Sequence, residues 1–287
     1  MYARAVELLP EQLKKTAAAL ADRPAEEFRL RLDRLPTALC RGRELPLSQR
    51  PVSAQDLWRC LEKATGASIH TAAPALREGF VCYRGLRVGV CGVGAYQGAE
   101  LCGFRSYSSL AIRIPAQKTG VCDSACRELF SEGICNTLII APPGVGKTTA
   151  LREIVRKLSD SGQRICLVDE RNELAAFDTG KAQFDVGSHT DIMTGINKAQ
   201  AAIMLLRGMN PQLVAVDEIT RAEDCEAIAE LYGCGVGIIA TAHAADHREL
   251  YSRRLYKRLL DTGIFKNLLI VNAVGGERTY RVKKLCT

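Results

Sequence analysis

The chain has 287 residues, with 47% hydrophobic and 25% charged, which is typical of a soluble globular protein with room for two modest domains. No apolar run is long enough to span a membrane, no signal-peptide core is present, and the twelve cysteines form no Cys-x-x-Cys pair. We therefore expect a cytosolic protein with reduced thiols, whose net charge of +7 comes entirely from residues 251–287.

The first 115 residues are predicted to form a small α+β domain. Apolar spacing over residues 6–21 predicts a helix, and the strict alternation of residues 28–33 predicts a half-buried strand. A second helix is expected after Ser53, which forms an N-capping pattern with Asp56. Three apolar segments separated by glycines then predict a small antiparallel sheet, at residues 80–83, 87–91 and 109–114. This domain carries no catalytic motif.

The rest of the chain, residues 136–287, is predicted to be an α/β domain, joined to the first by a linker helix within residues 116–135. Strand and helix patterns alternate here, which predicts a parallel sheet with helices on both faces. The expected strands are at residues 138–140, 164–168, 213–216 and 236–241. Residues 269–273 and 279–282 predict a terminal hairpin.

Residues 141–149, Ala-Pro-Pro-Gly-Val-Gly-Lys-Thr-Thr, look like a phosphate-binding loop between a strand and a helix. Free backbone N–H groups and the helix dipole make such a turn an anion site. We predict that Lys147 reaches the β- and γ-phosphates of ATP and that Thr148 binds Mg²⁺. Ala141 replaces the usual glycine, and the alternative is a turn beside a solvated lysine. The predicted nucleotide-binding residues are Pro143, Gly144, Val145, Gly146, Lys147, Thr148 and Thr149.

Residues 213–218, Leu-Val-Ala-Val-Asp-Glu, predict a buried strand that ends in two acids. Ligands of open α/β sheets bind at the carboxyl ends of the strands. We predict that Asp217 holds Mg²⁺ and that Glu218 activates the attacking water. Alternatively, the acids are solvated and open the next helix, for which Thr220 and Glu223 form a capping-box pattern.

Two further strand ends carry polar residues on the expected ligand side. Asp169 and Glu170 end one strand, and His243 ends another. Their alternatives are a pair of turn acids and a surface or helix-capping histidine. Arg207 precedes the acidic strand, where it could form an ion pair with a phosphate or an acidic side chain. We predict catalytic roles for Glu218, Lys147, Glu170, Arg207 and His243.

The basic excess near the C-terminus includes one predicted helix, over residues 249–260. Arg253, Arg254, Lys257 and Arg258 share one of its faces. Such a face suits an anionic membrane, a nucleic acid or an acidic patch on a neighbouring subunit. An ordinary solvated helix face is equally compatible with the pattern.

These motifs together resemble the stage III sporulation protein AA family, which is related to the type II and type IV secretion and pilus-motor ATPases. The resemblance rests on residues 168–173, Val-Asp-Glu-Arg-Asn-Glu, on Arg207-x-Met-Asn-Pro211, on Val-Asp-Glu-Ile at 216–219 with Arg221, and on Thr241-Ala-His243. Softer similarities lie in the N-terminal region, at residues 28–32, 79–80, 87–90 and 112–114.

The resemblance implies a RecA-like P-loop ATPase core behind a smaller sensor-like α+β domain, assembled as a hexameric ring. It implies a cytoplasmic location in the mother cell, at the inner face of a membrane, with membrane proteins of a sporulation channel as partners. Asp169 and Glu170 match the acidic box of secretion ATPases, and His243 matches the histidine box. An arginine finger is implied, with four candidates in Arg87, Arg113, Arg171 and Arg207.

We therefore predict an Mg²⁺-dependent ATPase that energises the assembly of, or transport through, a sporulation channel. Two other classes stay open: a nucleic-acid-dependent RecA-like translocase, and a nucleotide-gated scaffold with little turnover. The basic helix has few aromatics that single-stranded nucleic acid stacks on, beyond Tyr251 and Tyr256, so we do not expect nucleic acid as a partner.

Overall fold

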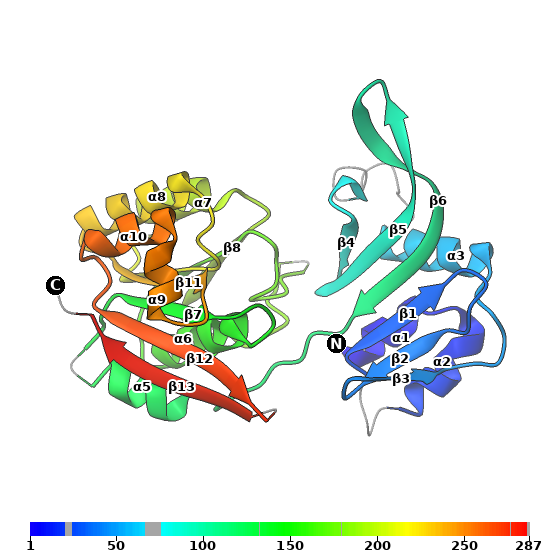
Figure 1. The fold of residues 1–287 in the computed structure, drawn as a ribbon, viewed down its shortest axis with the longest axis horizontal. Helices are drawn as coiled ribbons and strands as arrows, with labels where there is room; N and C mark the ends of the chain where they lie inside the picture. The colour runs from blue at the N-terminus through cyan, green and yellow to red at the C-terminus, as the bar shows by residue number, and fades with distance from the viewer. Residues whose placement is uncertain (21–24, 67–75, 132, 179, 276, 286–287) are drawn as a thin grey trace. The chain divides into compact units, whose positions relative to one another are not determined.

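The computed structural model describes residues 1–20, 25–66, 76–131, 133–178, 180–275 and 277–285. The chain divides into two compact units, Met1–Ala116 and Gln117–Thr287. Each unit has its own β-sheet with helices packed on it (Figure 1). No helix in these described ranges combines the length and the apolar character of a membrane span.

The first unit contains a six-stranded antiparallel sheet in the order β3-β2-β1-β6-β5-β4, which confirms the predicted antiparallel sheet. The two strands β2 and β3 were not predicted, because they are short and only one of them is partly buried. The strands are β1 Glu27–Arg31, β2 Thr37–Cys40, β3 Arg43–Pro46, β4 Phe80–Tyr83, β5 Leu86–Gln97 and β6 Glu100–Arg113.

Among the described residues of this unit, three helices pack against the sheet: α1 Tyr2–Leu8, α2 Glu11–Ala18 and α3 Ala54–Ala64. The single helix predicted over residues 6–21 is therefore wrong. Pro10 lacks a backbone N–H and forces Leu9 into an extended conformation, which ends α1; Ala21 lies outside the described residues. The predicted cap of α3 is confirmed, because the backbone N–H of Asp56 donates to the Ser53 hydroxyl at 3.2 Å.

The β5–β6 hairpin is much longer than the two separate strands that were predicted. Its outer part, from Gly92 to Tyr107, extends beyond the pairing with β1 and β4 and contains three register shifts (Figure 1). The glycines in this segment hid the alternation of a strand. At Gly92 a side chain would collide with the carbonyl oxygen of Ser106, so the close approach of the two strands requires glycine there.

The second unit contains a seven-stranded sheet in the order β13-β12-β7-β11-β10-β8-β9, parallel except for β13. This confirms the predicted α/β class with a parallel sheet and the terminal hairpin of β12 and β13. The edge strand β9 was missed, because its two apolar residues, Ile192 and Met193, are adjacent and so give no strand alternation. The strands are β7 Thr137–Ala141, β8 Ile165–Asp169, β9 Thr190–Thr194, β10 Leu213–Val216, β11 Gly237–His243, β12 Asn267–Val274 and β13 Glu277–Lys284.

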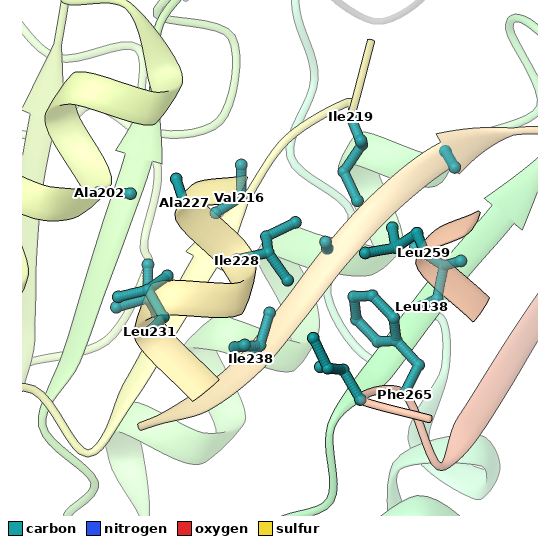
Figure 2. Close-up of a cluster of buried hydrophobic side chains, with 14 of the residues drawn as sticks. Leu138, Ala202, Val216, Ile219, Ala227, Ile228, Leu231, Ile238, Leu259 and Phe265 are labelled. Carbon is teal, nitrogen blue, oxygen red and sulfur yellow. The ribbon is translucent and has the colours of Figure 1, made fainter. Parts of the chain in front are cut away.

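Helices cover both faces of this sheet, so its central strands are apolar throughout. In β7, Leu138 and Ile140 pack with one set of helices, and Ile139 with the other. Figure 2 shows the first cluster, where Ile228 of α8 lies near Ile238 of β11 and Phe265. The first set is α7 Lys198–Met209, α8 Ala222–Gly233, α9 His247–Ser252 and α10 Arg254–Asp261; the second is α5 Asp123–Leu129 and α6 Lys147–Asp160.

The basic helix predicted over residues 249–260 is also wrong as a single element. Arg253 is extended between α9 and α10, and its guanidinium pairs with Glu249 at 2.6 Å. Arg254, Lys257 and Arg258 therefore lie on the short helix α10, with exposed side chains. The basic face is smaller than the sequence suggested.

Candidate functional site

The predicted phosphate-binding loop connects β7 to α6 at the carboxyl edge of the parallel sheet. Gly144 and Gly146 have φ values of 75° and 119°, which favour glycine, and Gly146 caps the N-terminus of α6. Ala141 is the last residue of strand β7 and has no positive φ, so its backbone does not require glycine. The replacement of the usual glycine at this position therefore leaves the loop geometry intact.

Lys147, the first residue of α6, points to the neighbouring strand β11 rather than to water. Its Nζ donates to Nδ1 of His243 at 2.7 Å, and Nε2 of His243 lies 3.1 Å from Oε1 of Glu218. Burial and the charge of Lys147 lower the pKa of His243, so its imidazole is neutral at pH 7. Since Lys147 can only donate, the proton of the neutral ring is on Nε2 and bonds to Glu218.

Asp217, just after β10, lies beside Thr148, the other predicted Mg²⁺ ligand. The Thr148 hydroxyl is 3.4 Å from one carboxylate oxygen, and the Thr241 hydroxyl donates to the other at 2.8 Å. Burial raises the pKa of Asp217 to about 6, opposed by the Thr241 hydrogen bond. Within the described part of the chain, no lysine or arginine forms an ion pair with Asp217. A hydroxyl and an uncompensated carboxylate suit a hard cation such as Mg²⁺.

We expect the Asp217→Asn substitution to stabilise the nucleotide-free protein. Folding raises the pKa of this carboxyl group, so the folded state binds its proton more tightly than the unfolded state does. Its contribution to the stability of the fold is therefore highest below about pH 4 and falls as the pH rises through about 6. At pH 7, the ionised carboxylate costs about 3 kcal/mol, which asparagine removes while still accepting from Thr241. Urea unfolding in EDTA at pH 5 and pH 8 measures this. The exposed Asp191, as Asp191→Asn, is the control; a less stable Asp217→Asn protein at pH 8 contradicts the argument.

The acids at the end of β8 do not both face the loop. The carboxylate of Asp169 accepts three backbone N–H groups, from Glu173, Leu174 and Ala175, and thereby holds the turn that follows β8. Glu170 lies 3.5 Å from Nζ of Lys198. The two acidic strand ends, at β8 and β10, nevertheless line one small cleft together with Arg171 and Lys198.

Lys198 is a site residue that the sequence did not reveal. It begins α7 and is almost fully buried, and its Nζ donates to the backbone carbonyl of Glu218 at 2.7 Å and to the Thr220 hydroxyl at 3.3 Å. Glu218 itself has a φ of 52°, an uncommon conformation for a residue with a side chain. Lys198 thus secures the backbone of Glu218 and links it to Glu170. No motif surrounds Lys198, so only the fold identifies it.

Two other interactions complete the frame of the site. Asp224 accepts from the backbone N–H groups of Thr220 and Arg221, which caps α8, whereas Glu223 of the predicted capping box does not. Arg152 of α6 donates to the carbonyls of Glu173 and Leu174, and burial lowers its pKa to about 10. Arg152 therefore ties the turn after β8 to the helix that carries Lys147.

The candidate arginine fingers lie in different places. Arg171 is exposed, and its guanidinium is 3.4 Å from Glu218. Arg207 lies in the last turn of α7, which runs back toward the opposite edge of the sheet, and it pairs with Glu230 at 3.7 Å. The structure therefore does not bring Arg207 to the loop of its own chain. Arg87 stacks on Phe80, and Arg113 lies 3.6 Å from Glu27, both within the first unit.

Comparisons with known proteins agree with this fold. The family model "Sporulation stage III, protein AA" matches residues 6–283. The stage III sporulation protein AA of Bacillus subtilis (strain 168) is 34% identical over 283 residues, covering 95% of this chain and 92% of its own. Among solved structures, the Legionella pneumophila ATPase DotB matches with a TM-score of 0.64 at 16% identity, covering 96% of this chain and 80% of its own. The pilus retraction motor PilT with bound ADP matches with a TM-score of 0.65 at 18% identity, covering 94% and 82%. The chain shares the P-loop ATPase fold of these proteins.

Proposed function

The chain belongs to the sporulation stage III protein AA family, and from this premise we propose that it is an Mg²⁺-dependent ATPase acting as an oligomeric motor for a sporulation channel. The observation that carries the proposal is the convergence of Lys147, Thr148, Asp217, Glu218 and His243 on one glycine-rich loop at the carboxyl edge of the sheet. The likeness in fold to DotB and PilT supports it.

Some residues of the site bind the nucleotide, and others take part in the chemistry. The backbone N–H groups of residues 143–149 and the charge of Lys147 bind the phosphates. Thr148 and Asp217 would hold Mg²⁺, which neutralises phosphate charge as it develops. Glu218 takes the proton of the attacking water, and its backbone is kept in place by Lys198, which also meets Glu170.

His243 connects phosphate binding to the catalytic carboxylate. In the structure, Lys147 is bonded to His243, and His243 is bonded to Glu218. When Lys147 turns to a phosphate, His243 loses this donor, and its Nδ1 must find another partner. The γ-phosphate of ATP therefore changes the hydrogen bonding of Glu218 through two side chains, which gives His243 the role of a sensor.

The positions of the arginines support assembly of the motor from several copies of the chain. Arg171 is exposed beside Glu218, and Arg207 is exposed at the far edge of the sheet from its own loop. In a closed ring with head-to-tail contacts, one subunit can present such an arginine to the nucleotide of the next. We propose a homo-oligomer, of six subunits by family resemblance, at the cytoplasmic side of a membrane that holds the partner proteins.

We expect the specific ATPase activity to rise with protein concentration, because an isolated subunit leaves the phosphates open to water and without the neighbour's arginine. Arg207→Ala should lower turnover more than nucleotide affinity. Phosphate release measured across a range of protein concentrations, together with sedimentation in Mg·ATP, tests both. Arg164→Ala, an arginine at the same edge of the sheet, is the control. A constant rate from a sedimenting monomer contradicts ring-dependent hydrolysis.

A second candidate, a nucleic-acid-dependent translocase, is favoured only by the exposed basic residues of α10, namely Arg254, Lys257 and Arg258. In a translocase of this kind, single- or double-stranded DNA would stimulate ATP turnover at low salt, and added salt would suppress the stimulation. A third class, a scaffold that binds ATP with little turnover, is distinguished by its hydrolysis rate. Its single-turnover hydrolysis stays near the uncatalysed rate, with or without the cytoplasmic parts of channel proteins.

A further inference from the structure

Arg278 lies close to the phosphate-binding loop, although it comes from the C-terminal hairpin, more than a hundred residues later. Strand β12 runs parallel to β7, with Ile270 beside Ile140. Arg278 of β13 pairs with Ala273, three residues further along β12. Arg278 is therefore placed at the carboxyl edge of the sheet, beyond the end of β7, where the loop begins.

The guanidinium of Arg278 rests against the last glycine of the loop. A methyl group on Gly146 would lie 2.9 Å from Cζ and 3.0 Å from Nε of Arg278. No acidic side chain among the described residues forms an ion pair with Arg278. Its charge does lower the pKa of Tyr280, two residues on along the same face, although burial raises that pKa overall. A half-buried guanidinium that forms no ion pair within the described part of the chain therefore lies against the anion cradle.

The loop is thus flanked by positive charge on two sides. Lys147 points toward β11, where His243 and Glu218 lie. Arg278 reaches the loop from the opposite side, because β12 and β13 follow β7 in the other direction across the sheet. The side of His243 and Glu218 is the one assigned above to the γ-phosphate. The backbone around Gly146 belongs to the part of such loops that surrounds the α- and β-phosphates.

We propose that Arg278 is a nucleotide-binding residue whose guanidinium donates hydrogen bonds to the diphosphate group common to ADP and ATP. The proposal rests on the proposed function, since it assumes that the loop binds a nucleotide. The planar fork of arginine fits two phosphate oxygens at once, which a single amide or lysine does not do. Arg278 acts on the nucleotide of its own chain, unlike an arginine supplied by a neighbouring subunit. It therefore strengthens ADP and ATP binding alike.

Titration calorimetry with Mg·ADP and with a non-hydrolysable ATP analogue tests whether Arg278 binds the diphosphate group. The variants are Arg278→Ala and Arg278→Lys, with Arg281→Ala as the control. Arg281 lies on the same strand with its side chain on the exposed face. Loss of a charge-assisted pair should weaken the affinity of Arg278→Ala for both nucleotides by roughly 10- to 100-fold. The ratio of the two affinities should stay unchanged. Arg278→Lys should recover part of the loss, and Arg281→Ala should bind as the wild type does.

Three results would overturn the inference. Unchanged affinities in Arg278→Ala mean that the guanidinium only packs on Gly146. A loss confined to the ATP analogue means that Arg278 acts on the γ-phosphate. An equal loss in Arg281→Ala means that net charge, not position, matters. Melting temperatures without nucleotide show whether the variants are folded. A wild-type chain that binds neither nucleotide overturns the proposed function as well, whereas binding that ignores Arg278 overturns this inference alone.

Discussion

The Glu218→Gln variant should bind ATP about as tightly as the wild type and lose roughly 10²- to 10⁴-fold in turnover. The substitution keeps the size of the side chain and its hydrogen bond through Oε1, but it removes the carboxylate that we propose as the base for the attacking water. In the proposed mechanism the loop and Lys147 bind the phosphates, and the change does not touch them. The loss should therefore appear in kcat and not in affinity.

The geometry explains why Glu218 is the better candidate base of the two acids at this strand end. Asp217 is crowded between Thr148 and Thr241, with both carboxylate oxygens directed at hydroxyl groups. Glu218 has its backbone N–H bonded to Thr241 and its carbonyl bonded to Lys198. Its backbone is therefore secured from two sides while the carboxylate stays partly exposed, where water can reach it.

Pre-steady-state phosphate release and binding of a fluorescent ATP analogue measure the two effects separately. Glu226→Gln, an exposed glutamate on α8, is the matched control. Full turnover in Glu218→Gln would assign the base to another carboxylate, and Glu170 is then the first to examine, because Lys198 joins it to the same network.

The convergence of the candidate residues was largely predictable, because their motifs follow strands that end at one edge of a parallel sheet. Once residues 137–141, 213–216 and 237–243 are read as parallel neighbours, Lys147, Glu218 and His243 must converge. The order of the strands and the exact hydrogen bonds were not predictable, since they depend on packing between segments far apart in the sequence. The apolar alternation that located the strands says nothing about their neighbours.

The residues that the sequence did not reveal share one property, which is that their partners are distant in the chain. Lys198 meets a carbonyl twenty residues away, and Arg278 meets a glycine more than a hundred residues away. Asp169 was assigned to the ligand side from its strand-end position, yet its carboxylate bonds to the backbone of the turn that follows. A position at a strand end therefore locates a side chain without fixing what it contacts.

The candidate site also carries energetic costs that point to the role of its residues. Burial lowers the pKa of Lys147 and raises that of Asp217, so each charged form is disfavoured by the fold. Glu218 adds an uncommon backbone conformation. Such costs concentrate where function, rather than stability, has selected the residue. Removing one of these charges should harm ligand binding more than folding.

We therefore expect the Lys147→Ala variant to fold normally and to lose nucleotide binding. In the proposed mechanism the buried ammonium group of Lys147 supplies charge at the phosphates, so its removal should reduce kcat/KM by roughly 10²- to 10³-fold or more. Since burial already lowers the pKa of Lys147, its loss should leave the melting temperature of the nucleotide-free protein unchanged or slightly higher. This separates a binding defect from an unfolded protein.

The decisive measurement is the shift in melting temperature that Mg·ATP produces, because ligand binding stabilises only the folded state. The wild type should show a clear upward shift, Lys147→Ala little or none, and the control Lys257→Ala, an exposed lysine of α10, the shift of the wild type. A Lys147→Ala protein that Mg·ATP stabilises as strongly as the wild type would contradict the assignment of the loop. If Lys147→Ala loses the Mg·ATP shift but keeps the wild-type melting temperature without nucleotide, then Lys147 serves nucleotide binding and does not stabilise the fold.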